Sequence, residues 1–384
     1  MRRLTVYVFY EANGIVDTYV KDILNEIIEA SEKVVFIING HITAEALDEI
    51  GKAVSSIIIR ENCGYDAGAY KDFFLTYMSK EELESYDEVV LMNNSFYGPI
   101  FKISDIFERM DCVEADFWGL TRHLRGNVGK RDEFPQHIQA YFLVIRKDMF
   151  GSKWFHEFWE DMKYPLTYSE AVNNFEIFFT TFFEAHDFIG KTLMDISEVG
   201  IELREEENPY LFYSYELLKN MQMPFIKKKC LHIENPGYIN AIKSMRFIES
   251  STDYTVDIIW NNVFRECKSN TYGSALNYYE LELFYKTHEK IYIYGAGQYG
   301  RALESYFAYR GWTIESFVVT NRDAICGDDV ISFSELKMSM DDGIILALST
   351  KYAEDVFNQI SQSLESEQIF TLNNFKCRKN DGKE

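Results

Sequence analysis

The sequence lacks the features that mark several classes of protein. Its six cysteines are scattered and form no Cys-x-x-Cys pair, so we expect neither a zinc site nor a disulfide framework, and we expect a cytoplasmic location. No segment has the ~20 uninterrupted apolar residues that a membrane-spanning helix needs. Positive charge is scarce, since 39 Lys and Arg stand against 61 Asp and Glu and give a net charge of −22. We therefore expect a soluble protein that does not bind nucleic acid.

Strand and helix patterns alternate through the first hundred residues. Met1–Tyr7 superficially resembles a signal peptide, but its apolar stretch stops at Glu11 without a cleavage site, so we interpret it as part of the first strand. The predicted strands are Leu4–Tyr10, Lys33–Asn39, Ser56–Arg60 and Asp87–Asn93. Strands separated by helices predict a parallel sheet. Ile138–Lys147 is predicted to be an antiparallel strand, because no full crossover helix precedes it.

The length of 384 residues is sufficient for two domains. We predict an α/β nucleotide-ligand domain over residues 1–235, a helical connector over 236–287, and a small Rossmann-like α/β domain over 288–376. The expected fold class is therefore a mixed sheet flanked by helices, plus a small C-terminal Rossmann-like domain.

Two polar segments with glycines follow predicted strands. Residues 62–68 follow the third strand and precede a helical pattern that opens at Ala69, and residues 93–99 end the fourth strand. Ligands bind where neighbouring strands of an open α/β sheet end. Asn, Asp and Gly also dominate ordinary turns, so a turn is the alternative for either segment. The candidate binding residues are Tyr10, Asn39, Asn62, Gly64, Asp66, Gly68, Asn93, Asn94, Ser95 and Gly98.

A series of short motifs carries a family resemblance. In chain order they are Asn62-x-Gly64-x-Asp66-x-Gly68, Asn93-Asn94-Ser95-Phe96-Tyr97-Gly98-Pro99, His137-x-Gln139-x-Tyr141-Phe142-Leu143, Asn208-Pro209-Tyr210 and Pro224-Phe225-Ile226-Lys227. The series resembles the rhamnan synthesis protein F family over residues 4–232. The resemblance implies a GT-A type glycosyltransferase of cell-surface polysaccharide assembly, with dTDP-rhamnose or a similar nucleotide sugar as donor. It also implies a glycan or lipid-linked glycan as acceptor, so that any membrane contact is peripheral, at the inner face.

The resemblance raises the question of a metal. Many GT-A enzymes hold Mn²⁺ or Mg²⁺ with an Asp-x-Asp pair where this chain has Asn93-Asn94-Ser95. Amide oxygens can bind a metal but bring no charge, so Asn94 is a weak candidate ligand. Two options stay open: a metal held mainly by the donor diphosphate and water, or metal-free transfer assisted by backbone donors or by cations such as Lys227–Lys229. Three adjacent lysines are more typical of a solvated surface, which is the interpretation we favour.

Glycosyl transfer with inversion needs a base for the acceptor hydroxyl. Glu176 is the first candidate, because we predict that it opens a helix over Phe175–Asp187, as the catalytic carboxylate does in inverting GT-A enzymes. An acidic residue in the first turn of a helix is the structural alternative. His137 and Asp116 are the other candidates.

Residues 291–310 predict a second ligand-binding turn. A strand, the Gly-x-Gly-x-x-Gly turn of Gly295, Gly297 and Gly300, and a helix follow one another, as in dinucleotide-binding domains. Thr320-Asn321 replaces the acidic residue expected at the end of the next strand, so NAD is not the expected ligand. The alternatives to a glycosyltransferase are a nucleotide-sugar-binding protein without turnover and an NAD-dependent oxidoreductase acting through this domain.

Overall fold

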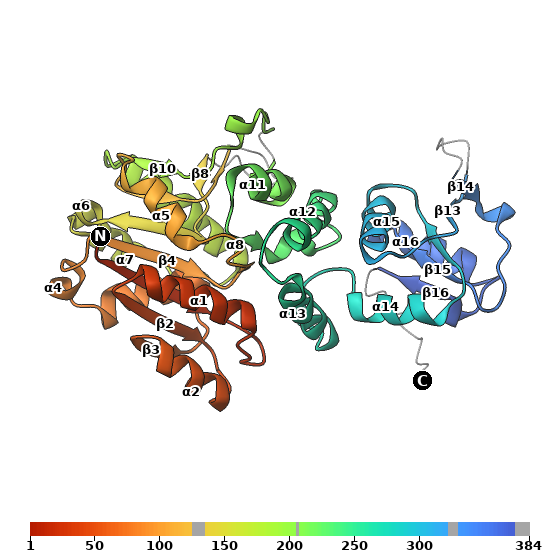
Figure 1. Ribbon diagram of the computed structural model, residues 1–384, viewed down its shortest axis with the longest axis horizontal. Helices are drawn as coiled ribbons and strands as arrows, with labels where there is room; N and C mark the ends of the chain where they lie inside the picture. The colour runs from red at the N-terminus through yellow and green to blue at the C-terminus, as the bar shows by residue number, and fades with distance from the viewer. Residues whose placement is uncertain (125–134, 205–206, 322–328, 373–384) are drawn as a thin grey trace. The chain divides into compact units, whose positions relative to one another are not determined.

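The computed structural model describes residues 1–124, 135–204, 207–321 and 329–372 (Figure 1). The chain divides into two compact units. The first comprises Met1–Lys228 with Ser251–Ile258, and the second comprises Lys229–Ser250 with Ile259–Glu384. The domain limits predicted at residues 235 and 287 stay a prediction.

The first unit is built on a seven-stranded sheet with the order β10-β6-β9-β4-β1-β2-β3. Its parallel part consists of β1 Arg3–Phe9, β2 Lys33–Asn39, β3 Ser56–Arg60 and β4 Glu88–Asn93. The predicted antiparallel strand is confirmed, since β9 Phe142–Arg146 runs antiparallel to β4. The short strands β6 Phe117–Gly119 and β10 Gly190–Thr192 complete the sheet.

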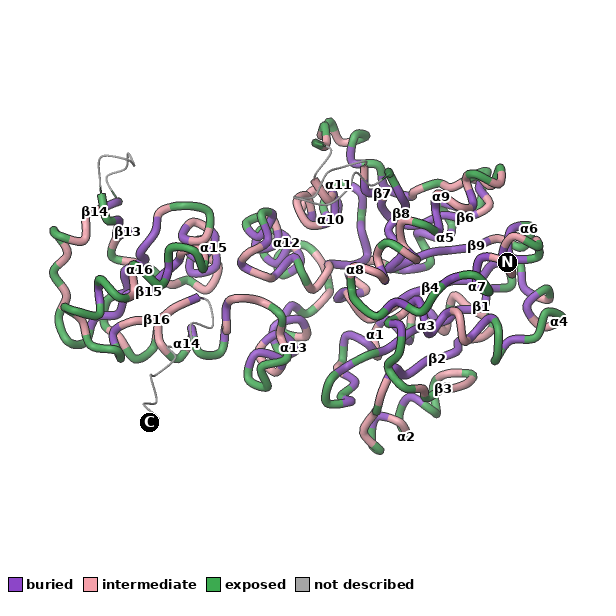
Figure 2. The backbone as a smooth tube through the Cα atoms, turned by 180° about the vertical axis from the view of Figure 1, so that it is seen from behind, coloured by how far each residue is buried: buried purple, intermediate pink, exposed green. Residues whose placement is uncertain are grey.

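Helices cover both faces of this sheet, as Figures 1 and 2 show from opposite sides. Helices α1 Thr18–Ala30 and α5 Ile103–Asp111 pack on one face. On the other face lie α3 Tyr65–Asp72, α7 Lys153–Asp161 and α9 Phe178–Glu184, whose aromatic side chains share one core with Leu4, Val6 and Val8 of β1. The central strands are consequently buried, as the purple segments in Figure 2 show.

The remaining elements of the first unit are short. They are α2 Ala44–Ala53, the π-helix η1 Phe73–Tyr77, α4 Lys80–Leu83, β5 Phe96–Tyr97, β7 Arg122–His123, β8 His137–Ile138, α6 Lys147–Phe150, α8 Tyr168–Ala171, the π-helix η2 Val172–Ile177, η3 Ile196–Val199, α10 Pro209–Phe212, α11 Ser214–Met221 and β11 Ile226–Lys227. Two of the predicted boundaries are wrong. Helix α3 begins at Tyr65 and not at Ala69, and Glu176 lies inside a helical run over 168–184 and does not open it.

The second unit contains a five-stranded parallel sheet with the order β14-β13-β12-β15-β16. Its strands are β12 Ile291–Tyr294, β13 Ser316–Val319, β14 Val330–Ser332, β15 Gly343–Leu346 and β16 Ile369–Thr371. Its helices are η4 Lys228–Leu231, α12 Tyr238–Ser251, α13 Val256–Lys268, α14 Tyr278–Thr287, α15 Gln298–Arg310, η6 Phe333–Glu335, α16 Thr350–Ile360 and η7 Ser366–Gln368, with η4, α12 and α13 including residues of the first unit. The predicted fold class, a mixed α/β sheet with a small parallel C-terminal sheet, is confirmed. None of the helices described is long and apolar enough to cross a membrane.

Candidate active site

The parallel strands β1, β2 and β4 end at one edge of the sheet, which we call the carboxyl edge and define by Tyr10, Asn39 and Asn93. The chain winds from β1 outward through β2 to β3 and then returns to place β4 on the other side of β1. Ligands of open α/β sheets bind at such a reversal of strand order. Here the two strand ends are tied together, because the Asn94 side chain donates to the Tyr10 carbonyl at 2.9 Å.

Asp66 reaches this reversal from helix α3. One carboxylate oxygen accepts a 2.7 Å hydrogen bond from Asn93 Nδ2, and the other accepts one from the backbone N–H of Ala67. Burial raises the pKa of Asp66, the hydrogen bonds from Asn93 and Ala67 oppose this rise, and the nearby charge of Glu176 adds to it. Asp66 and Asn93, which are 27 positions apart in sequence, therefore form one polar group at the carboxyl edge.

The glycines near Asp66 have an internal role. Gly64 has a φ of +77° at the start of α3, and a side chain there would meet the ring of Tyr164 at 2.9 Å. A side chain at Gly68 would meet the Cys63 carbonyl at 2.4 Å. Packing within the protein thus accounts for both glycines, and Asn62 is exposed. Contacts of these three residues with a donor stay predictions.

Glu176 lies in the π-helical segment η2, between α8 and α9. One carboxylate oxygen accepts a hydrogen bond from the N–H of Ala140 at 3.1 Å, and the other lies 3.5 Å from His137 Nε2. The prediction that Glu176 opens a helix is wrong, so the helix dipole does not explain the position of this carboxylate. A π-turn shifts side-chain directions relative to an α-helix and occurs often at functional sites. The irregular turn therefore sets where this carboxylate points.

The surroundings keep Glu176 ionised. Burial alone would raise the pKa of this carboxyl, but the contact with His137, the charge of Lys227 and the N–H of Ala140 outweigh it and lower the pKa. His137 also faces the Pro135 carbonyl through Nδ1 at 3.0 Å. One ring nitrogen of His137 therefore faces the carboxylate and the other faces a backbone carbonyl, and the two contacts fix the imidazole beside Glu176.

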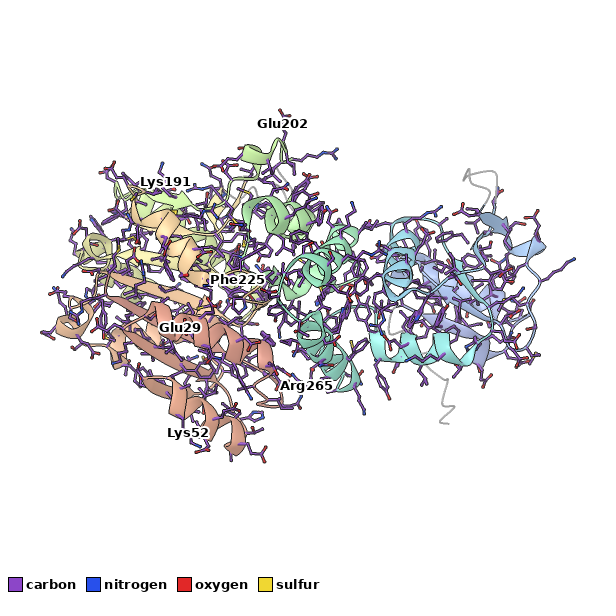
Figure 3. All side chains as sticks on the ribbon, in the orientation of Figure 1. Glu29, Lys52, Lys191, Glu202, Phe225 and Arg265 are labelled. Carbon is purple, nitrogen blue, oxygen red and sulfur yellow. The ribbon has the colours of Figure 1, made fainter. Side chains whose placement is uncertain are left out.

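Lys227 brings a positive charge to the same region. It lies on β11, which pairs with β5, so that Lys227 stands opposite Phe96. Its ammonium group lies 4.4 Å from the ring centre of Tyr141. Phe225, labelled in Figure 3, packs beside this strand pair, because its ring centre lies 4.3 Å from that of Phe96. Among the predicted lysines, this is the one whose charge acts on Glu176.

Ser95 lies between β4 and β5, and Gly98 directly follows β5. The Ser95 hydroxyl is buried and has no hydrogen-bond partner in the described part of the chain. A buried polar group without a partner is uncommon and indicates a missing ligand or water. Gly98 has a φ of +147°, and a side chain there would meet the Pro224 carbonyl at 2.5 Å, so its role is packing against the segment before β11.

Asp116 does not join this group. It precedes β6, which runs in the direction of β4, so it lies at the opposite edge of the sheet. Its carboxylate accepts a 2.7 Å hydrogen bond from the N–H of Ile189. Together with Asp87 and Arg146 it lines a hollow of about 410 Å³ at that edge. The structure brings Glu176 and His137 together and places Asp116 away from both.

The residues at the carboxyl edge do not fit a metal site. Asn94, the predicted ligand, has its amide oxygen directed to the N–H of Tyr10 at 3.3 Å and its amide nitrogen to the carbonyl of the same residue. Within the described residues, no group of three or more His, Cys, Asp or Glu side chains is arranged to hold a metal ion. We therefore derive no step of the reaction through a metal.

The glycine turn of the second unit has the geometry of its motif. Gly295 has a φ of +107°, and a side chain at Gly300 would lie 1.9 Å from the Gly295 carbonyl, so these two glycines serve the turn and the approach of α15. A side chain at Gly297 would meet no described atom within 4 Å. Thr320, in place of an acidic residue, shares a 2.7 Å hydrogen bond with Tyr294. Nucleotide binding by this turn stays a prediction.

The sequence analysis missed a support network below the carboxyl edge. Arg60 donates to Asn39 Oδ1 at 2.6 Å and to Asp72 at 2.8 Å, and Asn39 in turn donates to the Tyr65 carbonyl. Asn39 therefore acts within the protein, and its contact with a donor stays a prediction. Arginine directly after a run of isoleucines in β3 was the available signal.

Comparisons with known proteins give similar chains and one family match. The chain is 22% identical over 187 residues to the uncharacterized protein y4gN of Sinorhizobium fredii, covering 48% of this chain and 46% of that one, so it spans about half the length of that relative. It is 24% identical over 236 residues to virulence protein VirA of Vibrio anguillarum, covering 54% of this chain and 72% of that one. The apo-form glycosyltransferase GlyE of Streptococcus pneumoniae is 12% identical, with coverage of 97% and 96% and a TM-score of 0.35. Residues 34–291, more than half of the chain, match the model of rhamnan synthesis protein F, and the chain therefore belongs to that family.

Proposed function

We propose that the chain is a glycosyltransferase of the GT-A type that moves a sugar from a nucleotide-sugar donor to a glycan acceptor. Membership of the rhamnan synthesis protein F family supports this proposal. The observation that carries it is the Glu176 carboxylate, which is held by Ala140 and His137 beside the reversal of strand order. An ionised carboxylate in fixed orientation, next to the place where an α/β sheet binds its ligand, suits proton removal from a hydroxyl.

In this proposal the transfer inverts the configuration of the sugar. The acceptor hydroxyl oxygen forms a bond to the anomeric carbon while the bond from that carbon to the diphosphate oxygen breaks. The hydroxyl proton passes to Glu176, and the nucleoside diphosphate leaves with the bonding electrons. His137 acts as a positioning residue, because its Nε2 faces the carboxylate that accepts the proton.

Lys227 and Ser95 are suited to binding the diphosphate leaving group. Negative charge grows on the diphosphate as the bond to the sugar breaks, and a fixed cation stabilises it. The Lys227 ammonium is close enough to Glu176 to lower the pKa of that carboxyl. The Ser95 hydroxyl, which has no hydrogen-bond partner among the described residues, lies directly after the strand end. Both groups would donate to phosphate oxygens.

The donor and acceptor follow from the family and not from the geometry. We propose dTDP-rhamnose or a related nucleotide sugar as donor, and a growing cell-surface polysaccharide, free or lipid-linked, as acceptor. Activated donors of this kind place the enzyme in the cytoplasm, at the inner face of the membrane if the acceptor is lipid-linked.

A thermal-shift panel followed by a transfer assay tests the proposal. Ligands that bind the native state raise the unfolding temperature by mass action. We expect stabilisation by a nucleotide sugar, measured with and without Mn²⁺, and sugar transfer from that donor to an oligosaccharide acceptor. Stabilisation without any turnover would favour the binding-protein alternative, and stabilisation by NAD alone would favour the oxidoreductase.

A further inference from the structure

Tyr65 adopts a backbone conformation that aromatic residues rarely occupy. Its φ is +57°, in the left-handed region. The other non-glycine residues with positive φ among the described ranges are Asp187, Gln222 and Asn270. Asn and Asp tolerate this region, whereas a bulky side chain there is an outlier that points to strain or function. Tyr65 is the aromatic member of this set.

A buried network holds Tyr65 in place. Its carbonyl accepts a 2.9 Å hydrogen bond from Asn39 Nδ2, and Arg60 fixes the other end of that amide. Arg60 is itself paired with Asp72 and donates to the Cys63 carbonyl at 2.8 Å. Asn39 is 2% exposed. The protein therefore commits several buried polar groups to one unfavourable backbone geometry.

The side chain of Tyr65 is only partly buried. The residue is 38% exposed, whereas its neighbours Ala67 and Ala69 are fully buried. Tyr10 at the end of β1 is 50% exposed. Tyr10 follows β1 and Tyr65 comes after β3, and these two strands flank β2, which ends at Asn39. Two exposed tyrosines therefore come after the strands on either side of Asn39.

The direction of the two residues at the start of α3 separates two parts of the site. Asp66 turns to Asn93 on β4, and lies near the charge of Glu176. Tyr65 instead offers its backbone carbonyl to Asn39 at the end of β2, which places the residue beside that strand end, next to β3 in the sheet. If the reacting sugar and diphosphate lie at Glu176 and Lys227, the opposite end of the donor extends towards β2. That end is the nucleobase, and a flat exposed ring is the group on which a base stacks.

We propose that the ring of Tyr65 is the platform on which the nucleobase of the donor stacks, an inference that rests on the proposed function and adds a specific binding residue to it. The left-handed backbone conformation of Tyr65 is unfavourable, and it is retained because it presents the ring to the base. Glycine would adopt the same geometry freely but would offer no surface to the base.

Glycine and phenylalanine variants separate this role from a structural one. Tyr65→Gly should raise the unfolding temperature of the ligand-free protein and weaken dTDP or UDP binding by roughly 5- to 100-fold, the effect of losing one base-stacking contact. Tyr65→Phe should keep wild-type affinity. Gln222→Gly is the matched control, because Gln222 is a left-handed residue at the end of α11; it should raise stability and leave binding unchanged.

Isothermal titration with dTDP, UDP, CDP and GDP measures the affinities. Wild-type affinity in Tyr65→Gly, with binding in the parent protein intact, overturns the stacking role and leaves the proposed function standing. A loss seen with a nucleotide sugar but not with its nucleoside diphosphate assigns the ring to the sugar and overturns the base assignment. Absence of binding by the parent protein to every nucleotide and nucleotide sugar overturns both.

Discussion

Replacing Glu176 by Gln removes one proton acceptor and little else. The two side chains are nearly the same size, and the amide oxygen of Gln can still accept from the N–H of Ala140. The contact with His137 loses the carboxylate charge, so we expect a loss of about 1 kcal/mol in the free energy of unfolding, the typical net contribution of one hydrogen bond. Transfer should fall by ~10²–10⁴, the usual contribution of a positioned base. That fall corresponds to about 3–5 kcal/mol of transition-state stabilisation.

The pH dependence gives an independent check of the same carboxylate. The folded pKa of Glu176 lies below its ordinary value of 4.5, so the ionised form stabilises the fold. This contribution is present above pH 4.5 and is lost as the pH falls through the lower folded pKa. The difference in urea midpoint between the parent protein and Glu176→Gln should therefore shrink at acidic pH. The transfer rate of the parent protein should fall at acidic pH as Glu176 becomes protonated, and this fall should be absent in Glu176→Gln.

Single-turnover transfer from a nucleotide sugar to an oligosaccharide measures the predicted effect. Glu160→Gln serves as the control, because Glu160 is an exposed residue on α7. Donor affinity should be the same in all three proteins. Full transfer by Glu176→Gln would refute the assignment of the base. Loss of folding in that variant would instead show that the carboxylate serves the π-turn.

Three further changes test the surroundings of the site. Lys227→Met should weaken binding of a nucleoside diphosphate by about 1.5–3 kcal/mol, measured by titration calorimetry, while Lys229→Met should not. The pKa of Asp66 is raised in the folded protein, so protonated Asp66 stabilises the fold below pH 3.8, and this stabilisation is lost as the pH rises through the folded pKa. Asp66→Asn should remove this pH-dependent loss of stability, measured by urea unfolding at several pH values. The same pH dependence of stability in the variant and the parent protein would contradict the prediction. Glu88→Gln should cost about 3–5 kcal/mol of stability, because buried Glu88 pairs with Arg3 at 2.7 Å and Arg146 at 3.2 Å; a cost below about 1 kcal/mol would show that solvent compensates the two arginines.

The strands could be predicted because their residue patterns indicate burial on both faces of the sheet. Runs such as Val34–Ile38 and Val89–Met92 are apolar without alternation, which is typical of parallel strands covered on both faces. Where these strands end was also clear, and with it the placement of Tyr10, Asn39 and Asn93 on one edge.

The details of the site depend on contacts that local patterns do not encode. Helix α3 starts four residues before the predicted position, because Gly64 and Tyr65 take left-handed conformations that Asn39 and Tyr164 support from distant segments. Glu176 was found for an incorrect reason, as it lies in a π-turn and not at a helix start. Asp116 resembled a site residue until the antiparallel pairing of β9 placed it at the other edge.

The two carboxylates at the carboxyl edge have pKa values moved in opposite directions, and this difference separates their roles. Glu176 faces His137 and Lys227, which lower its pKa and hold it ionised. Burial, with a smaller contribution from the charge of Glu176, raises the pKa of Asp66 against the hydrogen bonds from Asn93 and Ala67, so Asp66 binds its proton more tightly. A carboxylate that stays ionised can accept the acceptor proton in every turnover. Asp66 is fixed by Asn93 and Ala67, so its contribution lies in holding the end of β4 against α3. The proposed reaction therefore takes its charge from Glu176 and Lys227 and its alignment from Asp66 and Asn93.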